Sequence, residues 1–161
     1  RQMCIRDRPM KYLTILLICF FFVKNDKAFS NVLPNDIFSA SEVIEIQMSA
    51  LQTNTVSNNE GIYQCWLFAH PENKKYTGPF PNFMNMIANT PYKILLNSLK
   101  FKTKLLSKDN NIAKFSVDVD AYDNRRYRLL WILEKAEIDT KCLNCWMTTS
   151  VTQPQYIGQL N

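Results

Sequence analysis

The chain has 161 residues and a formal net charge of +5, but that charge is concentrated near one end. Residues 1–30 hold six Lys or Arg and two Asp or Glu, whereas residues 31–161 hold thirteen and twelve, a net charge of +1. This balance removes the charge argument for a nucleic-acid partner, so none is predicted. We interpret a further group of lysines as the guard of a sheet edge against pairing rather than as a basic strip: Lys93, Lys100, Lys102, Lys104 and Lys108.

The first 30 residues divide into two segments with different interpretations. Residues 1–9, RQMCIRDRP, lack an initiator Met at the first position and show no periodicity, so we interpret them as a non-native artefact of sequencing or translation. From Met10, a lysine precedes an apolar run, Tyr12 to Val23, that is shorter than the roughly 20 residues of a membrane span. Residues 10–30 therefore predict a signal peptide cleaved after Ser30, with an uncleaved anchor as the alternative.

Such a leader predicts an exported protein with no stable membrane span after its removal. The compartment would be the periplasm or exterior of a bacterium, or a eukaryotic secretory or organelle route. About 130 residues then remain, without an internal repeat or a low-complexity linker, and make one domain of ordinary size. We expect a lead-in at 31–37, the domain at 38–157 and a tail at 158–161.

Two helices are predicted first along the domain. Ser39 and Glu42 form a capping box before EVIEIQMSALQ, in which apolar residues recur at helical spacing. Ser57 and Glu60 repeat the capping box before a second amphipathic segment. Pro71 ends that segment, because proline lacks an N–H and restricts the residue before it.

A third helix is predicted from Gly78-Pro79 to about Thr90, and after Pro91 the apolar period changes from 3.6 to 2. The short apolar run 92–96 opens this second half of the domain. Half-polar alternation then predicts antiparallel strands with a turn at Asp123-Asn124, in segments 99–105, 113–122, 125–135 and 146–152. Helices followed by such strands predict an α+β fold, in which the N-terminal helices pack on a curved antiparallel sheet.

Several segments, taken in order, resemble the DUF4864 family of uncharacterised proteins: VIEIQMSALQ, GIYQCWLFAHPENKKYTGPFPNFMNMI, YKILLNS and WILEK…CWMTTSV. The shared pattern is a Gln-x-x-Ala-Leu helix, a Phe-Ala-Ser-Pro-like stop, a Thr-Gly-Pro turn, a Tyr at the next strand and a late Trp. The matching residues are Gln47, Ala50, Leu51, Phe68, Ala69, Pro71, Asn73, Thr77, Gly78, Pro79, Phe83, Met86, Tyr92 and Trp146, and His70 stands at the Ser position of the stop.

This resemblance covers about residues 40–155 and implies an NTF2-like or cystatin-like, cone-shaped α+β fold. It implies no activity and no cofactor. Family members often have Ser where this chain has His70, so the resemblance does not imply a family reaction that depends on an imidazole there.

His70, the only histidine of the chain, is the first candidate for acid–base chemistry, because an unperturbed imidazole titrates near neutral pH. The alternative places His70 at the C-terminal end of the second helix, where a cation complements the helix dipole. We favour this structural interpretation, because no nucleophile–base–orienter set is apparent.

Asp118 and Asp120 are the second candidates, since paired carboxylates serve in acid–base catalysis or hold a hard cation. On an alternating strand they share one face. We favour a solvent-exposed face on which they lie opposite Arg126 and Arg128 of the neighbouring strand.

Three cysteines remain after the leader. Cys65 lies on the apolar stripe of the second helix and is expected to be a buried structural thiol. Cys142 and Cys145 form a CxxC between two strands, which favours a local disulfide in a hairpin, or two plain thiols, over a redox motif. A zinc site made by these three cysteines and His70 is arithmetically possible but weakly indicated, so no metal and no cofactor are predicted.

The aromatic residues are mostly expected in the core, but a concave sheet under helices can leave an apolar pocket. We predict its lining at Tyr92, Val117, Val119, Tyr127 and Trp131. The leading hypothesis is a non-catalytic exported domain that binds a small apolar ligand or a protein partner, with a homodimer possible. The alternative is a small NTF2-like enzyme, an isomerase or dehydratase, with an acid–base pair in the cone.

Overall fold

Helices come first along the chain and strands follow, as the sequence predicts. The computed structural model describes residues 30–137 and 142–160, so the predicted leader segments at 1–9 and 10–30 lie outside the described residues except for Ser30. The helices are α2 (Ala40–Gln52), α3 (Glu60–Leu67), α4 (Pro71–Thr77), α5 (Phe80–Asn89) and the 3₁₀-helix η2 (Pro91–Leu95). The strands are β1 (Lys100–Lys108), β2 (Ile112–Asp120), β3 (Arg125–Lys135), β4 (Trp146–Val151) and β5 (Gln155–Gln159).

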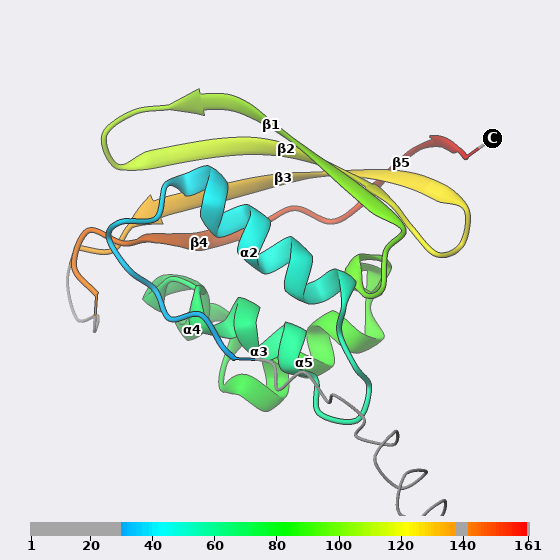
Figure 1. Ribbon diagram of the computed structural model, residues 1–161, viewed down its shortest axis with the longest axis horizontal. Helices are drawn as coiled ribbons and strands as arrows, with labels where there is room; N and C mark the ends of the chain where they lie inside the picture. The colour runs from blue at the N-terminus through cyan, green and yellow to red at the C-terminus, as the bar shows by residue number, and fades with distance from the viewer. Residues whose placement is uncertain (1–29, 138–141, 161) are drawn as a thin grey trace, which may run out of the picture. The chain divides into compact units, whose positions relative to one another are not determined.

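The strands form one antiparallel sheet in the order β1-β2-β3-β4, and β5 also pairs with β3. β4 pairs with Trp131–Lys135, whereas β5 pairs with Arg125–Arg128. Pro154 lies between these two short strands, and proline cannot donate a backbone hydrogen bond to the sheet. Figure 1 shows the labelled helices on one side of the sheet, which confirms the α+β fold class.

We call the sheet face that meets the helices the inner face, and the opposite one the outer face. Along β2 and β3 the burial alternates with a period of two, because successive side chains point to opposite faces. One core cluster joins the inner face to α2 through Val43, Ile44, Met48, Val117, Val119, Leu129 and Leu133.

The first predicted capping box is confirmed, and the second is wrong. The hydroxyl of Ser39 accepts from the N–H of Glu42, whose carboxylate accepts from the N–H of Ser39 at 2.8 Å. The N-cap of α3 is instead Asn59, with φ 53° and no side-chain cap bond, rather than Ser57. Asn tolerates this left-handed conformation better than most residues do, so the backbone turns into α3 without a capping box.

Two close approaches require glycine. A Cβ on Gly61 would lie 2.1 Å from the carbonyl oxygen of Ala50, so α2 and α3 could not pack as closely with any other residue. Gly78 ends α4 with φ 81°, in the left-handed region that favours glycine, and lets the chain turn directly into α5.

Three predictions of local structure are wrong. Pro71 does not end α3, which stops at Leu67 with Phe68 as its C-cap; it instead occupies the first position of α4, where its missing N–H needs no partner. Tyr92–Leu96, expected to open the strand half of the domain, lies mostly in η2, because an apolar run this short has no diagnostic period. The predicted tail at 158–161 begins inside β5, whose polar sequence carries no apolar alternation.

Most of the lysines predicted to protect a sheet edge do lie on an edge strand. β1 pairs only with β2, and four of the five lysines lie on this edge strand, with Lys93 in η2 instead. Within residues 30–137 and 142–160, no helix has both the length and the apolar character needed to cross a membrane.

Candidate functional site

A cavity of about 330 Å³ lies between the helices and the inner face of the sheet. Most of its lining is apolar. It is formed by Gln47, Leu51, Cys65, Ala69, Glu72, Asn73, Tyr76, Thr77, Phe83, Met86, Ile87, Tyr92, Leu95, Trp131, Thr148, Thr149, Ser150 and Val151. The cavity thus draws on every described helix and on β3 and β4.

A bulge in β4 explains why consecutive residues of one strand line the cavity. Thr148 pairs with Leu133 and Ser150 pairs with Ile132, so Thr149 is the extra residue between them. Its hydroxyl donates to the carbonyl of Ile132 at 3.1 Å. In a regular strand only alternate residues could face the cavity, and the bulge re-aims this segment so that four in a row contribute.

A buried chain of hydrogen bonds runs along the cavity wall. The indole N–H of Trp131 donates to the hydroxyl of Thr148 at 3.0 Å, and that hydroxyl donates to Oε1 of Gln47 at 2.8 Å. Nε2 of Gln47 donates to the carbonyl of Cys65 at 3.4 Å. These bonds satisfy groups that would be costly to bury alone, because an unpaired buried polar group costs about 1–3 kcal/mol.

Polar residues of α4 form the rim of the cavity. α4 contains no buried residue, and the Tyr76 side chain is 94% exposed. Two of its side chains reach neighbouring elements: the Asn73 side chain donates to the carbonyl of Thr148 at 3.2 Å, and the Lys74 ammonium lies 5.0 Å from the Trp66 ring. The rim is therefore wetter and more loosely held than the walls.

Two of the five predicted ligand-binding residues line the cavity. Tyr92 does so from η2, with its hydroxyl donating to the carbonyl of Val151 at 2.9 Å, and Trp131 does so from β3. Val117 and Val119 are fully buried in the core and do not reach the lining. Tyr127 lies beyond it, where its hydroxyl donates to Asp123 at 2.8 Å and its ring meets Tyr156 of β5 edge-on.

His70 is not at a helix C-terminus, so that structural prediction is wrong. It is the N-cap of α4, where its Nδ1 accepts from the N–H of Glu72 at 3.2 Å. Partial burial lowers the pKa of His70, although Glu134 and Glu72 oppose this effect. The imidazole lines an open groove with Glu134 and Lys135 and is absent from the lining of the cavity.

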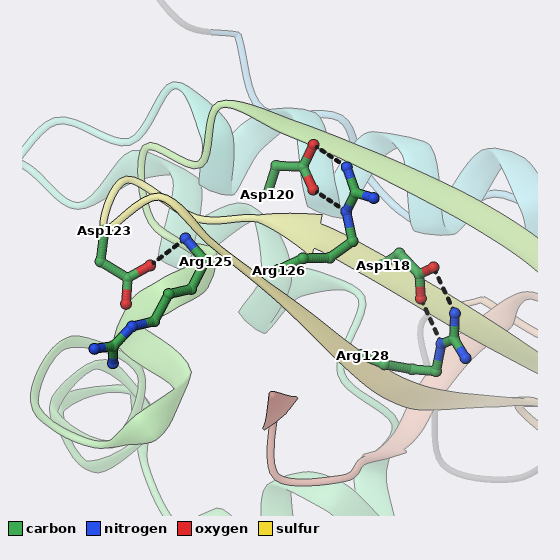
Figure 2. Close-up of polar contacts among 6 residues, drawn as sticks. All are labelled: Asp118, Asp120, Asp123, Arg125, Arg126 and Arg128. Atoms are coloured by element: carbon green, nitrogen blue, oxygen red, sulfur yellow. Dashed lines mark hydrogen bonds and ion pairs between the residues drawn. The ribbon is translucent and has the colours of Figure 1, made fainter. Parts of the chain in front are cut away.

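Asp118 and Asp120 lie on the outer face and are absent from the cavity lining. Figure 2 shows each carboxylate facing its arginine partner. Arg128 binds both carboxylate oxygens of Asp118 at 2.7 Å, and Arg126 binds those of Asp120 at 2.5 and 3.0 Å. These hydrogen bonds lower the pKa of both carboxyl groups. The predicted cross-strand pairs are confirmed, and both oxygens of each aspartate accept hydrogen bonds from its arginine.

The cysteines are placed in two separate settings. Cys142 and Cys145 are joined by a disulfide in the connection before β4, with Cα atoms 5.7 Å apart. The Cys65 thiol is not disulfide-bonded; it donates to the carbonyl of Gln47, and burial raises its pKa. A thiol in this state is a poor nucleophile at neutral pH. In the described part of the chain, no group of three His, Cys, Asp or Glu side chains is arranged to hold a metal ion.

The cavity residues that the sequence analysis missed include the polar ones of α2, α4 and β4. Gln47 had a usable sequence signal, because it is in phase with Ile44, Met48 and Leu51 on the buried stripe of α2. A polar residue in such a stripe needs a buried partner. The lining residues of α4 had no comparable sequence signal, because the segment PENKKYT has no apolar period.

The chain matches no family model, no curated protein and no solved structure. The resemblance to the DUF4864 family therefore stays a sequence-based prediction, and the function is argued from the cavity alone.

Proposed function

We propose that the domain is a non-catalytic module that binds a small, mainly apolar ligand in the cavity. The observation that carries this proposal is the chemistry of the lining. Among the described residues that form it, Glu72 alone has a formal charge, and that residue lies on the exposed rim, paired with Lys75 at 2.6 Å. Ligand pockets are typically apolar with a few well-placed polar groups, as this one is.

The size of the cavity sets the size of the ligand. Its volume of about 330 Å³ is at the lower end of the roughly 300–1,000 Å³ of ligand pockets. An apolar cavity of about 150 Å³ holds one benzene molecule, so this one has room for about two such rings.

The enzymatic alternative loses its candidate residues. A general acid–base pair must lie within hydrogen-bond reach of a substrate, and the two aspartates lie on the outer face, bound to arginines. His70 uses Nδ1 to cap α4 outside the cavity. No specific contact favours an isomerase or dehydratase over simple binding.

The wider context of the proposal rests on sequence. We propose from the apolar leader that the protein is exported, and from the ordered segments that the domain is a DUF4864-like member of the NTF2-like or cystatin-like folds. A protein partner, a second copy of the chain included, is the occupant to consider if no small molecule binds.

The test is a titration with the neutral fluorophore N-phenylnaphthylamine, whose emission rises in an apolar site. We expect saturable binding that the Met86→Trp substitution weakens at least tenfold, because the larger side chain of this half-buried lining residue fills the cavity. Met84→Trp is the matched control, since Met84 is also half-buried on α5 but does not line the cavity. Absent saturation, or equal affinity in the two variants, would refute the proposal.

A further inference from the structure

The direction of each hydrogen bond along the cavity wall follows from one group that can only donate and one that can only accept. The indole nitrogen of Trp131 has no acceptor capacity, so the hydroxyl oxygen of Thr148 must accept from it. The carbonyl of Cys65 can only accept, so the carboxamide atom of Gln47 that faces it is the nitrogen, and the atom beside the Thr148 hydroxyl is the carbonyl oxygen Oε1, which accepts the Thr148 proton. The amide nitrogen Nε2 of Gln47 is therefore on the other side of the carboxamide, which fixes its orientation.

One proton of Gln47 is left over in this arrangement. Nε2 carries two donor protons, and it makes a single long hydrogen bond, 3.4 Å to the carbonyl of Cys65. The second proton has no acceptor among the described residues. Gln47 is 1% exposed, so it is almost entirely enclosed by the protein.

The residue that carries this proton lies in the cavity wall. Gln47 and its two hydrogen-bond partners, Cys65 and Thr148, all belong to the cavity lining, as does Trp131, which donates to Thr148. A buried donor without a partner is destabilising, and a ligand that accepts its proton removes part of that penalty. The cavity therefore rewards a hydrogen-bond acceptor at this point.

The same lining disfavours an anion. No Lys, Arg or His is among the described lining residues, and the rim carries the carboxylate of Glu72. Moving a carboxylate into an apolar site without a paired cation is far more costly than moving a neutral carbonyl. The neutral amide of Gln47 offers one hydrogen bond but no compensating charge.

From these contacts we infer that the ligand is an uncharged molecule with an apolar body and one hydrogen-bond acceptor, such as a ketone, whose oxygen binds the free Nε2 proton of Gln47. This inference rests on the proposed function and names the ligand class of the same site. It assigns Gln47 as the residue that determines specificity, while the apolar walls provide most of the affinity.

The experiment compares ligands with one carbon skeleton in displacing N-phenylnaphthylamine from the full chain. Tetralin has no acceptor, tetralone adds one neutral carbonyl, and tetralin carboxylate adds a charge. With the wild-type protein we expect tetralone to displace the probe best and the carboxylate worst. In Gln47→Leu the preference for tetralone over tetralin should fall by about tenfold, the value of one hydrogen bond of about 1.4 kcal/mol.

Gln64→Leu is the matched control. Gln64 is also 1% exposed, but both polar ends of its side chain bind the backbone of Val32, at 2.8 and 2.7 Å, and it does not line the cavity. This variant should keep the wild-type preference. An unchanged preference in Gln47→Leu, or an equal loss in both variants, would overturn the inference.

A second readout covers the case in which Gln47→Leu does not fold. The carbonyl stretching band of tetralone bound to the wild-type protein should lie below its frequency in a hydrocarbon solvent, because a hydrogen bond weakens the C=O bond. A band at the hydrocarbon frequency would overturn the inference. If tetralin and tetralone both bind without these signs, the inference fails while the proposed function stands; if neither ligand nor the fluorophore binds, the proposed function itself fails.

Discussion

The two faces of the sheet differ sharply, although the same strands form both. On the inner face Val117 and Val119 are 0% exposed and belong to the core cluster. On the outer face the residues between and after them, Asp118 and Asp120, form ion pairs with β3. The residue types with the most obvious chemistry are thus on the face without the cavity. Burial and enclosure, rather than reactive residue types, locate the candidate site.

The largest expected effect comes from shortening adjacent leucines on opposite faces. Leu129→Ala removes a fully buried side chain and leaves a void, so we expect the free energy of unfolding to fall by about 3 kcal/mol. Leu130→Ala, on the half-buried outer side of the same strand, should cost about 1 kcal/mol or less. Urea denaturation measures both, and equal losses would contradict the assignment of the two faces.

A smaller effect is expected from the threonines beside the bulge. Thr148→Val leaves both Trp131 Nε1 and Gln47 Oε1 without a partner, so we expect a loss of about 2 kcal/mol in unfolding free energy. Thr149→Val removes one hydrogen bond to the carbonyl of Ile132 and should cost about 1 kcal/mol. Thermal denaturation compares the two, and a larger loss in Thr149→Val would show that the buried chain of hydrogen bonds does not stabilise the inner face.

His70 provides a pH-dependent test of α4, which lies on the inner side but is nearly as exposed as the outer face. Partial burial lowers the pKa of His70 below the ordinary 6.5, so the unfolded chain binds the proton first as the pH falls. The contribution of His70 should therefore be complete above pH 6.5 and decline as the pH falls from 6.5 toward the folded pKa.

The matched variant for this test is His70→Asn, which retains a cap but does not titrate. It should remove this part of the pH dependence, whereas His70→Ala should cost about 0.5–1 kcal/mol at neutral pH. Melting temperatures measured from pH 5 to pH 8 would check this. A wild-type protein that gains stability below pH 6.5 relative to His70→Asn would contradict the neutral cap.

The smallest effect is expected from the outer-face ion pairs. Asp118 and Arg128 are both partly exposed, and exposed pairs contribute little because water and salt screen them. Breaking the pair with Asp118→Asn should lower the melting temperature by about 2 °C or less at neutral pH. The pKa of Asp118 is lowered, so this contribution should be present above pH 3.8 and be lost as the pH falls toward the folded pKa. A fall in melting temperature as large as the one caused by Leu129→Ala would contradict the difference in stability contribution between the two faces.

Much of the fold was predictable because local signals and tertiary packing agree. The capping box at Ser39 begins α2, and the alternation in AKFSVDVDAY places the inner and outer residues of β2 correctly. That alternation also placed Asp118 opposite Arg128, since both belong to the polar face of paired antiparallel strands. These features depend on residues close in sequence or on one simple period.

The missed elements depend instead on contacts between distant segments. α4 has no apolar stripe and is held by single contacts from Asn73 and Lys74 to β4 and α3. β5 is recruited by backbone pairing with β3, which requires no particular side chains. Of the candidate site, Tyr92 and Trp131 were predictable as aromatics near the inner face, whereas the extra residue at Thr149 follows from the register of β4 on β3 and has no sequence signature.

The backbone contact between Ala69 and Thr148 has a kinetic consequence. There the N–H of Thr148 donates to Phe68 and the N–H of His70 donates to Thr148, each at 2.8 Å, so the α3–α4 junction covers the free edge of β4. The two segments are roughly 80 positions apart, and contacts of such long range form late in folding. Until they form, β4 presents an open edge that lacks the lysines protecting β1. Self-association during refolding should therefore start at β4, and faster docking of the helical segment should suppress it.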